Sequence, residues 1–285
     1  MVHLGVITDE ISEDFDHVLS VCTELGIRHL ELRSIWNKSV VDLDPADLEK
    51  VKSKVTNGGF TVVSIASPFL KTHLSGEVAP AAGNTHSASI ATRAQQGEVL
   101  ERTLHAAHVL DAPIVRTFSF WRLDDPEAAR NEILEELTQA TATVNAAGKL
   151  LGLENEHACN IATGAESKWY LDRIADPVFG LIWDPGNEAA LGQNPVPAGY
   201  EAVKDRVHNV HLKDAISFDD GAGFTAVGDG AIDYIQQFQL LIRDRYEGVI
   251  SIETHYKIDG EKEPATRATA AGIRRVAAEA GLTID

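Results

Sequence analysis

Short apolar runs alternate along the whole chain with longer segments of helical period. A run of about four to eight apolar residues bounded by polar or glycine positions is typical of a buried strand, whereas apolar residues three and four positions apart form one face of a helix. The pattern therefore predicts strands that alternate with helices. The predicted strands are His3–Ile7, His29–Leu32, Thr61–Ile65, Ile114–Phe118, Leu150–Glu154, Val178–Trp183, Val207–Leu212 and Val249–Glu253.

Residues that begin and end helices lie between these runs. The pairs Asp44-Pro45 and Asp125-Pro126 each place a capping carboxylate before a proline at the first helical position. Glycine, which readily adopts the left-handed conformation that closes a helix, follows several helical segments. The glycines predicted to end helices are Gly26, Gly58 with Gly59, and Gly148.

Eight strand-helix units predict a parallel sheet with right-handed crossovers. The length of 285 residues and the lack of a Gly/Ser/Pro-rich linker favour a single α/β domain over residues 1–285, a (β/α)8 TIM barrel. A doubly wound open sheet is the alternative, but the first turn, residues 7–10, lacks the glycine fingerprint that binds a pyrophosphate. The longest irregular stretch, Pro68–Thr85, is interpreted as a lid or rim loop.

The chain is acidic, with 43 aspartate and glutamate residues against 25 lysine and arginine residues and a formal net charge of −18. Such a surface repels the phosphates of nucleic acids and anionic membranes, so neither is an expected partner. No apolar run approaches the roughly 18 residues of a membrane span, and His3–Ile7 is too short for a signal peptide, so a cytoplasmic location is expected. The two cysteines, Cys22 and Cys159, form neither a disulfide framework nor a zinc motif, and Cys22 falls on an apolar helix face.

Four successive predicted strands end with residues that bind metals. The site of a TIM barrel is built at the carboxyl ends of its strands, so these residues converge. Each alone has a simple explanation as a solvated cap, a turn or a hydrogen-bonded histidine, but together they would repel one another unless a cation held them. Three carboxylates and one imidazole predict a divalent site for Mn²⁺ first, with Mg²⁺, Co²⁺ or Zn²⁺ as alternatives. The four residues are Glu154, Asp184, His211 and Glu253.

Side chains two positions apart on a strand point the same way. Glu156, Lys213 and His255 therefore extend the inward-facing set toward the mouth of the barrel. Lys213 is the candidate to steady a developing oxyanion or to donate a proton, with an ion pair to a ligand carboxylate as the alternative. Arg116, inside a strand, is expected to point inward and to pair with a carboxylate, for which Glu31 is the candidate.

Further residues near the strand ends are candidates for substrate contact. Asn187 follows Asp184 by three positions and is expected to contact substrate, as are Arg116, Glu156 and His255. Four aromatic residues could form an apolar wall against a sugar ring or belong to the core. These are Trp36, Phe69, Phe118 and Trp121, of which Trp121 is the principal candidate for substrate binding.

Around these residues the chain resembles the xylose-isomerase-like barrel superfamily, also called sugar phosphate isomerases/epimerases. This superfamily includes ketose 3-epimerases, hydroxypyruvate isomerase, inosose dehydratase and AP endonucleases. The resemblance spans essentially the whole chain, and its motifs are short individually but specific in combination and order. The motifs are Leu153-Glu154-Asn155, Asp184 to Asn187, His211 to Asp214, Ile252-Glu253 and the stretch Gly228 to Asp233.

The resemblance implies that Glu154, Asp184, His211 and Glu253 bind the metal and that the two glutamates also flank the reacting carbon. A divalent ion chelated by a carbonyl and a neighbouring hydroxyl acidifies the C–H between them and stabilises the resulting enediolate. The glutamates, held on opposite sides, could then remove the proton from one face and return it to the other. The implied activity is that of an isomerase or epimerase acting on a small carbohydrate or keto-polyol, with a homo-oligomer left open.

Three other functions remain as alternatives. A lyase of the same fold, such as an inosose-type dehydratase or a 3-keto-glycoside β-eliminating enzyme, would begin with the same proton abstraction. A nuclease would need further histidine ligands, which Thr117-Phe118-Ser119 does not offer, and Asn187 stands where a second metal would want histidine. A sugar-binding barrel without catalysis is the third. Because the glycine-rich segment 219–224 carries two acids and no arginine, an unphosphorylated substrate is expected.

Overall fold

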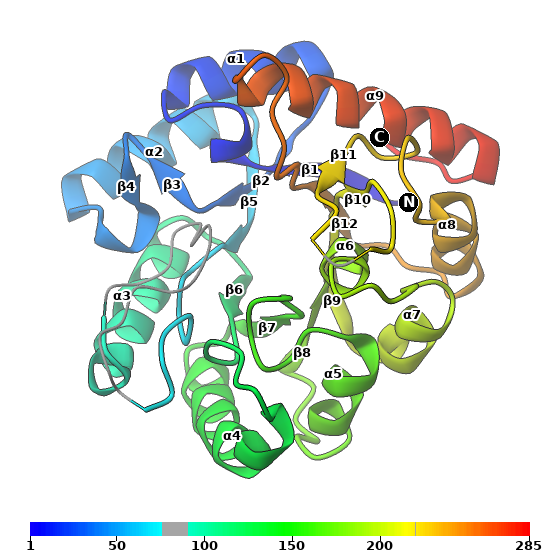
Figure 1. Cartoon of the computed structure of the whole chain (residues 1–285). Coiled ribbons are helices and arrows are strands. Elements are labelled where there is room, and N and C mark those ends of the chain that lie inside the picture. Colours follow the sequence, from blue (N-terminus) through cyan, green and yellow to red (C-terminus); the bar gives the residue numbers. More distant parts are fainter. Residues whose placement is uncertain (76–90, 220) are drawn as a thin grey trace.

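The eight predicted strands form one closed parallel barrel in the computed structural model, which describes residues 1–75, 91–219 and 221–285 (Figure 1). Strand β1 pairs with both β2 and β12, and this closes the ring. The predicted (β/α)8 fold is therefore confirmed. In chain order the barrel strands are β1 (His3–Ile7), β2 (His29–Leu32), β5 (Thr61–Ile65), β6 (Ile114–Thr117), β7 (Leu150–Glu154), β8 (Phe179–Trp183), β9 (Val207–Leu212) and β12 (Val249–Ile252).

Three strands are one residue shorter than predicted, since Phe118, Val178 and Glu253 lie just outside β6, β8 and β12. The backbone N–H of Phe118 donates to the carbonyl of Phe69 in the segment after β5, so the chain leaves β6 at this residue. Val178 and Glu253 each still make one backbone hydrogen bond to a neighbouring strand, with Leu151 and Leu212 respectively. The side chains of Phe118 and Glu253 are buried and that of Val178 is partly buried, so burial extends past the bounds of the three strands.

Helices surround the barrel on the outside, as Figure 1 shows. Their capping residues largely follow the sequence signals. The Asp44 side chain accepts a hydrogen bond from Asp47 N at the start of α2, and Asp125 caps the short 3-10 turn Pro126–Ala129 that leads into α4. The helices described are α1 (Phe15–Leu25), α2 (Pro45–Gly58), α3 (Gln96–Val109), α4 (Arg130–Ala146), α5 (Gly164–Leu171), α6 (Pro185–Ala189), α7 (Ala198–Val203), α8 (Tyr234–Arg243) and α9 (Lys262–Ala280).

The glycines predicted to end helices do so in the left-handed conformation. Gly26 closes α1 with φ 68°, and Gly59 closes α2 with the same angle. Gly148, with φ 66°, follows α4 by two residues. A side chain at φ values in this range would be strained, so these positions confirm the helix ends read from the sequence.

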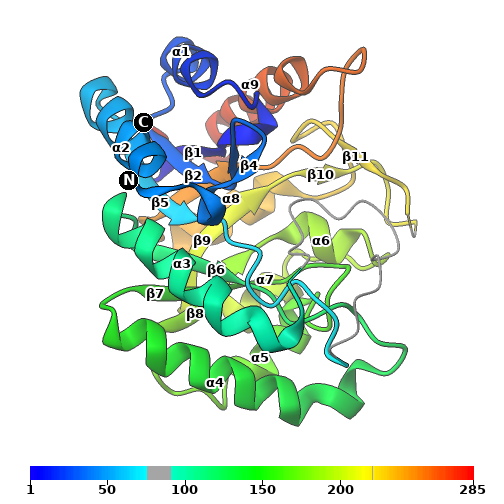
Figure 2. The ribbon, with the colours of Figure 1, turned by 90° about the vertical axis from the view of Figure 1, so that its left-hand side faces the viewer.

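The carboxyl end of the barrel strands bears a short hairpin and buried charges, and the opposite end bears the chain termini. The strands point toward one end, where the short hairpin of β10 (Asp214–Ala215) and β11 (Phe224–Thr225) lies, and both chain termini lie at the opposite end (Figure 2). Strand β8 is buried along its whole length, as expected of a parallel strand covered by helices on its outer face. Buried charges gather instead at the carboxyl ends of the strands.

The two cysteines and the membrane expectation can be checked directly. Cys22 and Cys159 are both buried and free, so the predicted core position of Cys22 is confirmed. Among the residues that the structure describes, no helix is both long enough and apolar enough to cross a membrane.

Glu188 on α6 provides a prediction about pH and stability. Its Oε2 accepts a hydrogen bond from the backbone N–H of Gly164 at 2.8 Å, and the side chain is buried. Burial raises the pKa of Glu188 from 4.5 to about 7. Between these values the folded protein holds a proton that the unfolded chain has lost, so this residue makes the free energy of unfolding fall as the pH rises.

We expect Glu188→Gln to remove this loss, because glutamine keeps an oxygen for Gly164 and never ionises. Relative to the unsubstituted protein, the variant should gain up to about 3 kcal/mol of stability between pH 4.5 and pH 8. Urea denaturation at both pH values measures the difference. A stability difference that stays constant over this range would contradict the assignment.

Candidate metal centre and active site

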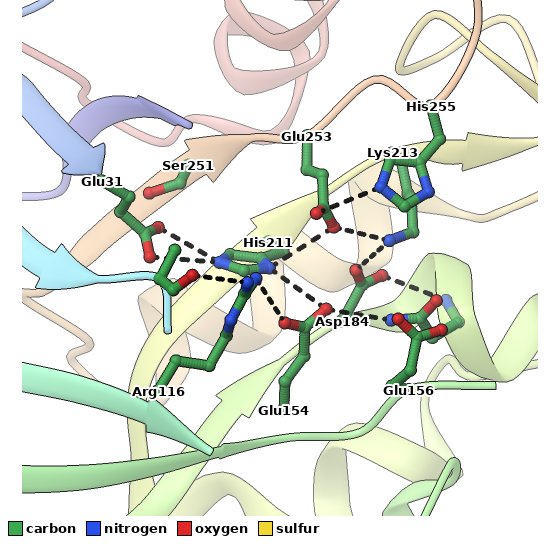
Figure 3. A network of polar contacts seen from close by, with 12 residues as sticks. Glu31, Arg116, Glu154, Glu156, Asp184, His211, Lys213, Ser251, Glu253 and His255 are labelled. Carbon is green, nitrogen blue, oxygen red and sulfur yellow. Dashed lines mark hydrogen bonds and ion pairs between the residues drawn. The ribbon is translucent and has the colours of Figure 1, made fainter. Parts of the chain in front are cut away.

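The four predicted ligands meet at the carboxyl end of the barrel (Figure 3). One ligand atom from each lies within 4.8 Å of the others, and all four side chains are buried. Glu154 ends β7, Asp184 follows β8 directly, His211 lies next to the end of β9, and Glu253 follows β12. The parallel register brings these positions to one level of the ring, and the structure therefore places the predicted set around one point.

His211 is oriented by Glu31 of β2. The Nε2 atom of His211 lies 3.1 Å from Glu31 Oε1, and its Nδ1 faces Glu154 Oε1 at 3.6 Å and Glu253 Oε2 at 3.5 Å. This Nδ1 is buried and has no hydrogen-bond partner among the described residues. Burial alone lowers the pKa of His211, but Glu31 and Glu154 outweigh it and hold the pKa well above its usual range. A carboxylate behind a histidine in this way is the usual support of a metal-binding imidazole.

Glu154 is anchored on one oxygen by Arg116. The guanidinium donates from Nη1 to Glu154 Oε2 at 3.0 Å and also binds the carbonyls of Ala66 and Ser67. Burial and Glu253 raise the pKa of Glu154, but Arg116 and His211 together hold it below its usual value. Its other oxygen, Oε1, faces the common point.

Glu253 is anchored in the same way by Arg33. Arg33 Nη1 donates to Glu253 Oε1 at 2.9 Å, and Lys213 Nζ donates to Oε2 at 2.7 Å. Burial raises the pKa of Glu253, but Lys213 and His255 outweigh this effect and hold it well below its usual range. Glu253 is therefore ionised at neutral pH, as a proton acceptor must be.

The two carboxylate oxygens of Asp184 have different partners, one at the start of α6 and one at the candidate metal centre. Its Oδ1 accepts from the backbone N–H of Asn187 at 3.0 Å and so caps α6, while Oδ2 lies 2.5 Å from Lys213 Nζ. Burial raises the pKa of Asp184 to about 6 although Lys213 opposes this effect. Each of the four predicted ligands thus has one atom held by a neighbour and a second atom directed toward the shared point, where Lys213 also contacts Glu253 Oε2 and Asp184 Oδ2.

Arg33 connects this centre to the end of β1. Its guanidinium binds Asp9 at 2.9 Å and Glu10 at 2.5 Å as well as Glu253, and its side chain is only 2% exposed. Burial raises the pKa of Glu10, but Arg33 outweighs it and lowers the pKa to about 2. Thr254 donates to the second oxygen of Glu10 at 2.6 Å. Glu10 and Glu253, whose pKa values are lowered, therefore stay ionised throughout the neutral range.

Glu156 belongs to a second charged group beside the centre. It lies 2.8 Å from Lys71 Nζ and 2.8 Å from His157 Nδ1. The Lys71 ammonium lies over the ring of Phe118 at 4.4 Å and near that of Trp121 at 5.8 Å. Trp121 is half-buried, so it lies where a molecule entering the barrel could touch it.

Asn187 and His255 complete the predicted set. Asn187 Nδ2 donates to Glu154 Oε1 at 3.3 Å, and its Oδ1 lies 2.9 Å from His157 Nδ1. His255 Nε2 lies 3.1 Å from Glu253 Oε1, and its ring packs edge-on against Phe224 of β11. Both residues therefore contact a candidate ligand directly.

A family model described as Xylose isomerase-like TIM barrel matches residues 19–277. The chain belongs to this family.

Curated relatives of this xylose isomerase-like barrel match over part of their length. An inosose dehydratase from Clostridium botulinum (strain Eklund 17B / Type B) is 30% identical over 113 residues, which cover 33% of this chain and 38% of that protein. An inosose dehydratase from Serratia proteamaculans (strain 568) is 30% identical over 135 residues, which cover 41% of this chain and 43% of that protein. The chain thus aligns with less than half the length of these relatives.

Solved structures of similar fold cover nearly the whole barrel at low sequence identity. The IolI protein with a binding zinc atom has a TM-score of 0.76 at 16% identity and covers 98% of this chain and 99% of its own. A 3-keto-D-glucoside 4-epimerase from E. coli, in its apo form, has a TM-score of 0.72 at 16% identity and covers 98% and 100%. A D-tagatose 3-epimerase-like protein has a TM-score of 0.72 at 18% identity and covers 98% and 99%. These likenesses show the fold.

The predicted partner of Arg116 in this family's barrel is wrong. Arg116 points inward as predicted, but its carboxylate partner is Glu154 rather than Glu31, which reaches across to His211 and Asn209. Trp36 packs edge-on against Phe15 and lies against the core, which agrees with the core alternative. Neighbouring strands of a barrel offer several partners to a long inward side chain, and alternation along one strand does not say which is nearest.

The predicted aromatic wall and rim loop are only partly described. Phe69 and Phe118 are buried, which agrees with the core alternative, although Phe118 also lies under Lys71. The predicted loop Pro68–Thr85 contributes Lys71 to the site, while residues 76–85 lie outside the described residues.

The sequence reasoning missed four residues of the site, Asp9, Glu10, Arg33 and Lys71, and did not foresee the role of Glu31. Asp9 and Glu10 follow β1, and Arg33 follows β2, so the rule that found the ligands at four other strands would have found them if applied to the first two. Lys71 lies six residues beyond the end of β5, where no strand periodicity applies. Only its position between two aromatic residues and a buried glutamate, a property of the folded chain, reveals it.

Proposed function

We propose that this protein is a divalent-metal-dependent isomerase or epimerase that moves a proton beside the carbonyl of an unphosphorylated sugar or sugar derivative. The observation that carries the proposal is that the protein holds one atom of each of the four candidate ligands in place. Glu154 Oε2, Glu253 Oε1, Asp184 Oδ1 and His211 Nε2 are each held by the protein. The second atom of each is thereby directed at one point.

The donor set fits a divalent ion. Three carboxylate oxygens and one imidazole nitrogen suit Mn²⁺, Mg²⁺, Co²⁺ or Zn²⁺, and we propose Mn²⁺ first because oxygen donors predominate. The buried Nδ1 of His211, which lacks a hydrogen-bond partner among the described residues, is the atom that such an ion would satisfy. The IolI protein, whose fold is similar, has a bound zinc atom, and this supports a divalent ion here.

Glu154 and Glu253 would transfer the proton in the proposed reaction. A divalent ion at this point would polarise a carbonyl and its neighbouring hydroxyl and offset the negative charge that develops when the C–H proton leaves. Glu154 and Glu253 come from β7 and from the end of β12, on opposite sides of the point, and both carboxyls are held ionised. One would accept the proton from one face of the substrate, and the other would deliver a proton to the opposite face or to the adjacent carbon.

Lys213 and the second charged group would position the substrate. The Lys213 ammonium is fully buried between Asp184 and Glu253, where it can donate to an oxygen that gains charge during the reaction. Arg116, Asn187 and His255 would hold the two glutamates and contact the substrate from the sides. Glu156, with Lys71 beside Trp121, would bind hydroxyl groups at the mouth of the barrel.

A lyase is the second candidate function, favoured by the curated relatives. Both inosose dehydratases align at 30% identity, although over less than half of their length. A dehydratase would use the same first step, the removal of a proton beside a carbonyl, and then expel a hydroxyl from the next carbon. Lys213 or His255, both near Glu253, would protonate that leaving group.

The reaction in D2O distinguishes these functions. The protein is stripped with a chelator, reloaded with Mn²⁺ and incubated with ketoses, inososes and 3-keto-glycosides, and the products are examined by mass spectrometry and, after metal removal, by proton NMR. We expect deuterium beside the carbonyl of an otherwise isomeric product, and no reaction in the stripped protein. Loss of water from the product would establish the lyase instead.

Binding of a sugar without exchange or elimination would contradict both the isomerase and the lyase and would indicate a sugar-binding barrel. A clear preference for phosphorylated substrates would overturn the proposed substrate class.

A further inference from the structure

A second group of metal-binding side chains lies at the other end of the barrel. His3 begins β1 and His29 begins β2, so both lie at the amino ends of neighbouring strands. Asp285 follows α9 and is held beside them, because its backbone N–H donates to the carbonyl of Val2 at 3.3 Å. In Figure 2 both termini lie at this end, away from the hairpin of β10 and β11.

The three side chains converge closely. His3 Nδ1 lies 2.5 Å from Asp285 Oδ2, and the rings of His3 and His29 have centroids 4.6 Å apart. One ligand atom from each residue lies within 4.8 Å of the others. They come from the starts of two strands and from the segment after the last helix, so the fold, and not a local motif, brings them together.

An ordinary ion pair explains only part of this arrangement. The contact of His3 with Asp285 satisfies two of the three groups, but the buried Nδ1 of His29 has no hydrogen-bond partner among the described residues. A buried polar atom without a partner costs free energy unless something outside the chain satisfies it. Since Asp285 and His3 are 42% and 34% exposed at the side chain, a small cation can reach the group from solvent.

We propose that His3, His29 and Asp285 bind one divalent transition-metal ion, of which Zn²⁺ is the representative. Two imidazoles and one carboxylate form a donor set that suits Zn²⁺, Co²⁺, Ni²⁺ or Cu²⁺ and disfavours Mg²⁺ and Ca²⁺. Water completes the coordination. Zn–N and Zn–O bonds of about 2.0 to 2.2 Å require the three ligand atoms to draw closer, and the exposed Asp285 side chain has the freedom to turn inward. Such an ion ties the segment after α9 to the first two strands.

Zinc binding to matched variants tests the proposal. The protein is stripped with a chelator, and equilibrium dialysis counts the Zn²⁺ bound by the unsubstituted protein, His29→Gln, Asp285→Asn and His17→Gln. His17→Gln is the control, because His17 is also an exposed histidine paired with a carboxylate, Glu263, but has no third ligand in the described residues. We expect His29→Gln and Asp285→Asn each to bind one equivalent fewer than the unsubstituted protein and His17→Gln to bind the same number.

The thermal stability of the same variants provides a second test, because an ion that joins the segment after α9 to β1 and β2 should stabilise the fold. Zn²⁺ is expected to raise the Tm of the stripped protein by a larger amount than it raises that of His29→Gln or Asp285→Asn, because an ion that binds only the folded state stabilises it. Both readouts are differences between variants, so Zn²⁺ bound at the carboxyl end of the barrel cancels. Equal Zn²⁺ stoichiometry in all four proteins would overturn the proposal.

Discussion

Replacing Glu253 by glutamine is expected to lower turnover by roughly 10³-fold to 10⁴-fold on whichever substrate the D2O experiment identifies. Glutamine has the same shape but accepts no proton and carries no charge for a divalent ion. It can still accept a hydrogen bond from Arg33, so the barrel should remain folded. Steady-state kinetics and metal binding measured on the same preparation check this, with Glu247→Gln, an exposed glutamate on the surface, as the matched control.

The corresponding change at Glu154 makes the test sharper. If Glu154 and Glu253 serve opposite faces of the substrate, each glutamine variant should still exchange the proton of one epimer with D2O while failing to convert it into the other. The two variants should therefore retain exchange from opposite epimers. Near-normal turnover of Glu253→Gln, or loss of exchange from the same epimer in both variants, would show that the two-sided role is mistaken.

Replacing Arg33 by methionine is expected to lower the free energy of unfolding by about 3 to 5 kcal/mol. The guanidinium is buried and pairs with Asp9, Glu10 and Glu253, so its removal leaves three buried carboxylates without their common partner. Urea denaturation at pH 7 measures the effect. Arg102→Met is a suitable control because Arg102 is half exposed and lies 3.5 Å from Asp42 on the surface, where such a change has an effect of about 0.5 kcal/mol or less.

The pH dependence of this difference identifies its cause. Arg33 holds the pKa of Glu10 at about 2, and without Arg33 burial would raise it above its ordinary value of 4.5. In the variant Glu10 then takes up a proton as the pH falls from 7, and the cost of its buried charge disappears. The stability gap between the two proteins should therefore narrow toward pH 4.5. A gap that is independent of pH would point to lost packing instead of lost charge pairing.

The sequence predicted the fold well because its main signal, the alternation of buried strands and amphipathic helices, is local. Each strand needed only its own apolar run, as in His29–Leu32, and several helix ends needed only a capping residue such as Asp44 or a glycine such as Gly26. The four candidate ligands were found for a related reason. A parallel barrel gathers the ends of its strands, so a position in the sequence becomes a position in space.

Partnerships across the barrel could not be predicted in this way. Glu31 and Arg116 were both expected to point inward, and both do. However, Arg116 pairs with Glu154, and Glu31 pairs with His211. These partners depend on the tilt and stagger of the barrel strands, which a pattern along one strand does not report. The register between β2 and β5 shifts between Leu30 and Glu31, an irregularity that no periodic pattern reveals. Lys71 lies beyond any strand, so only its contacts in the folded chain place it.

The closed ring of strands fixes the gap between Glu154 and Glu253. Glu154 ends β7 and Glu253 directly follows β12, and both strands are hydrogen-bonded on both sides, whereas Trp121 and Phe224 lie outside the barrel strands. Under the proposed function, substitutions at Trp121 and Phe224 would change which substrate is admitted without altering the distance between Glu154 and Glu253. Such a barrel could change its substrate during evolution and keep the same proton-transfer step.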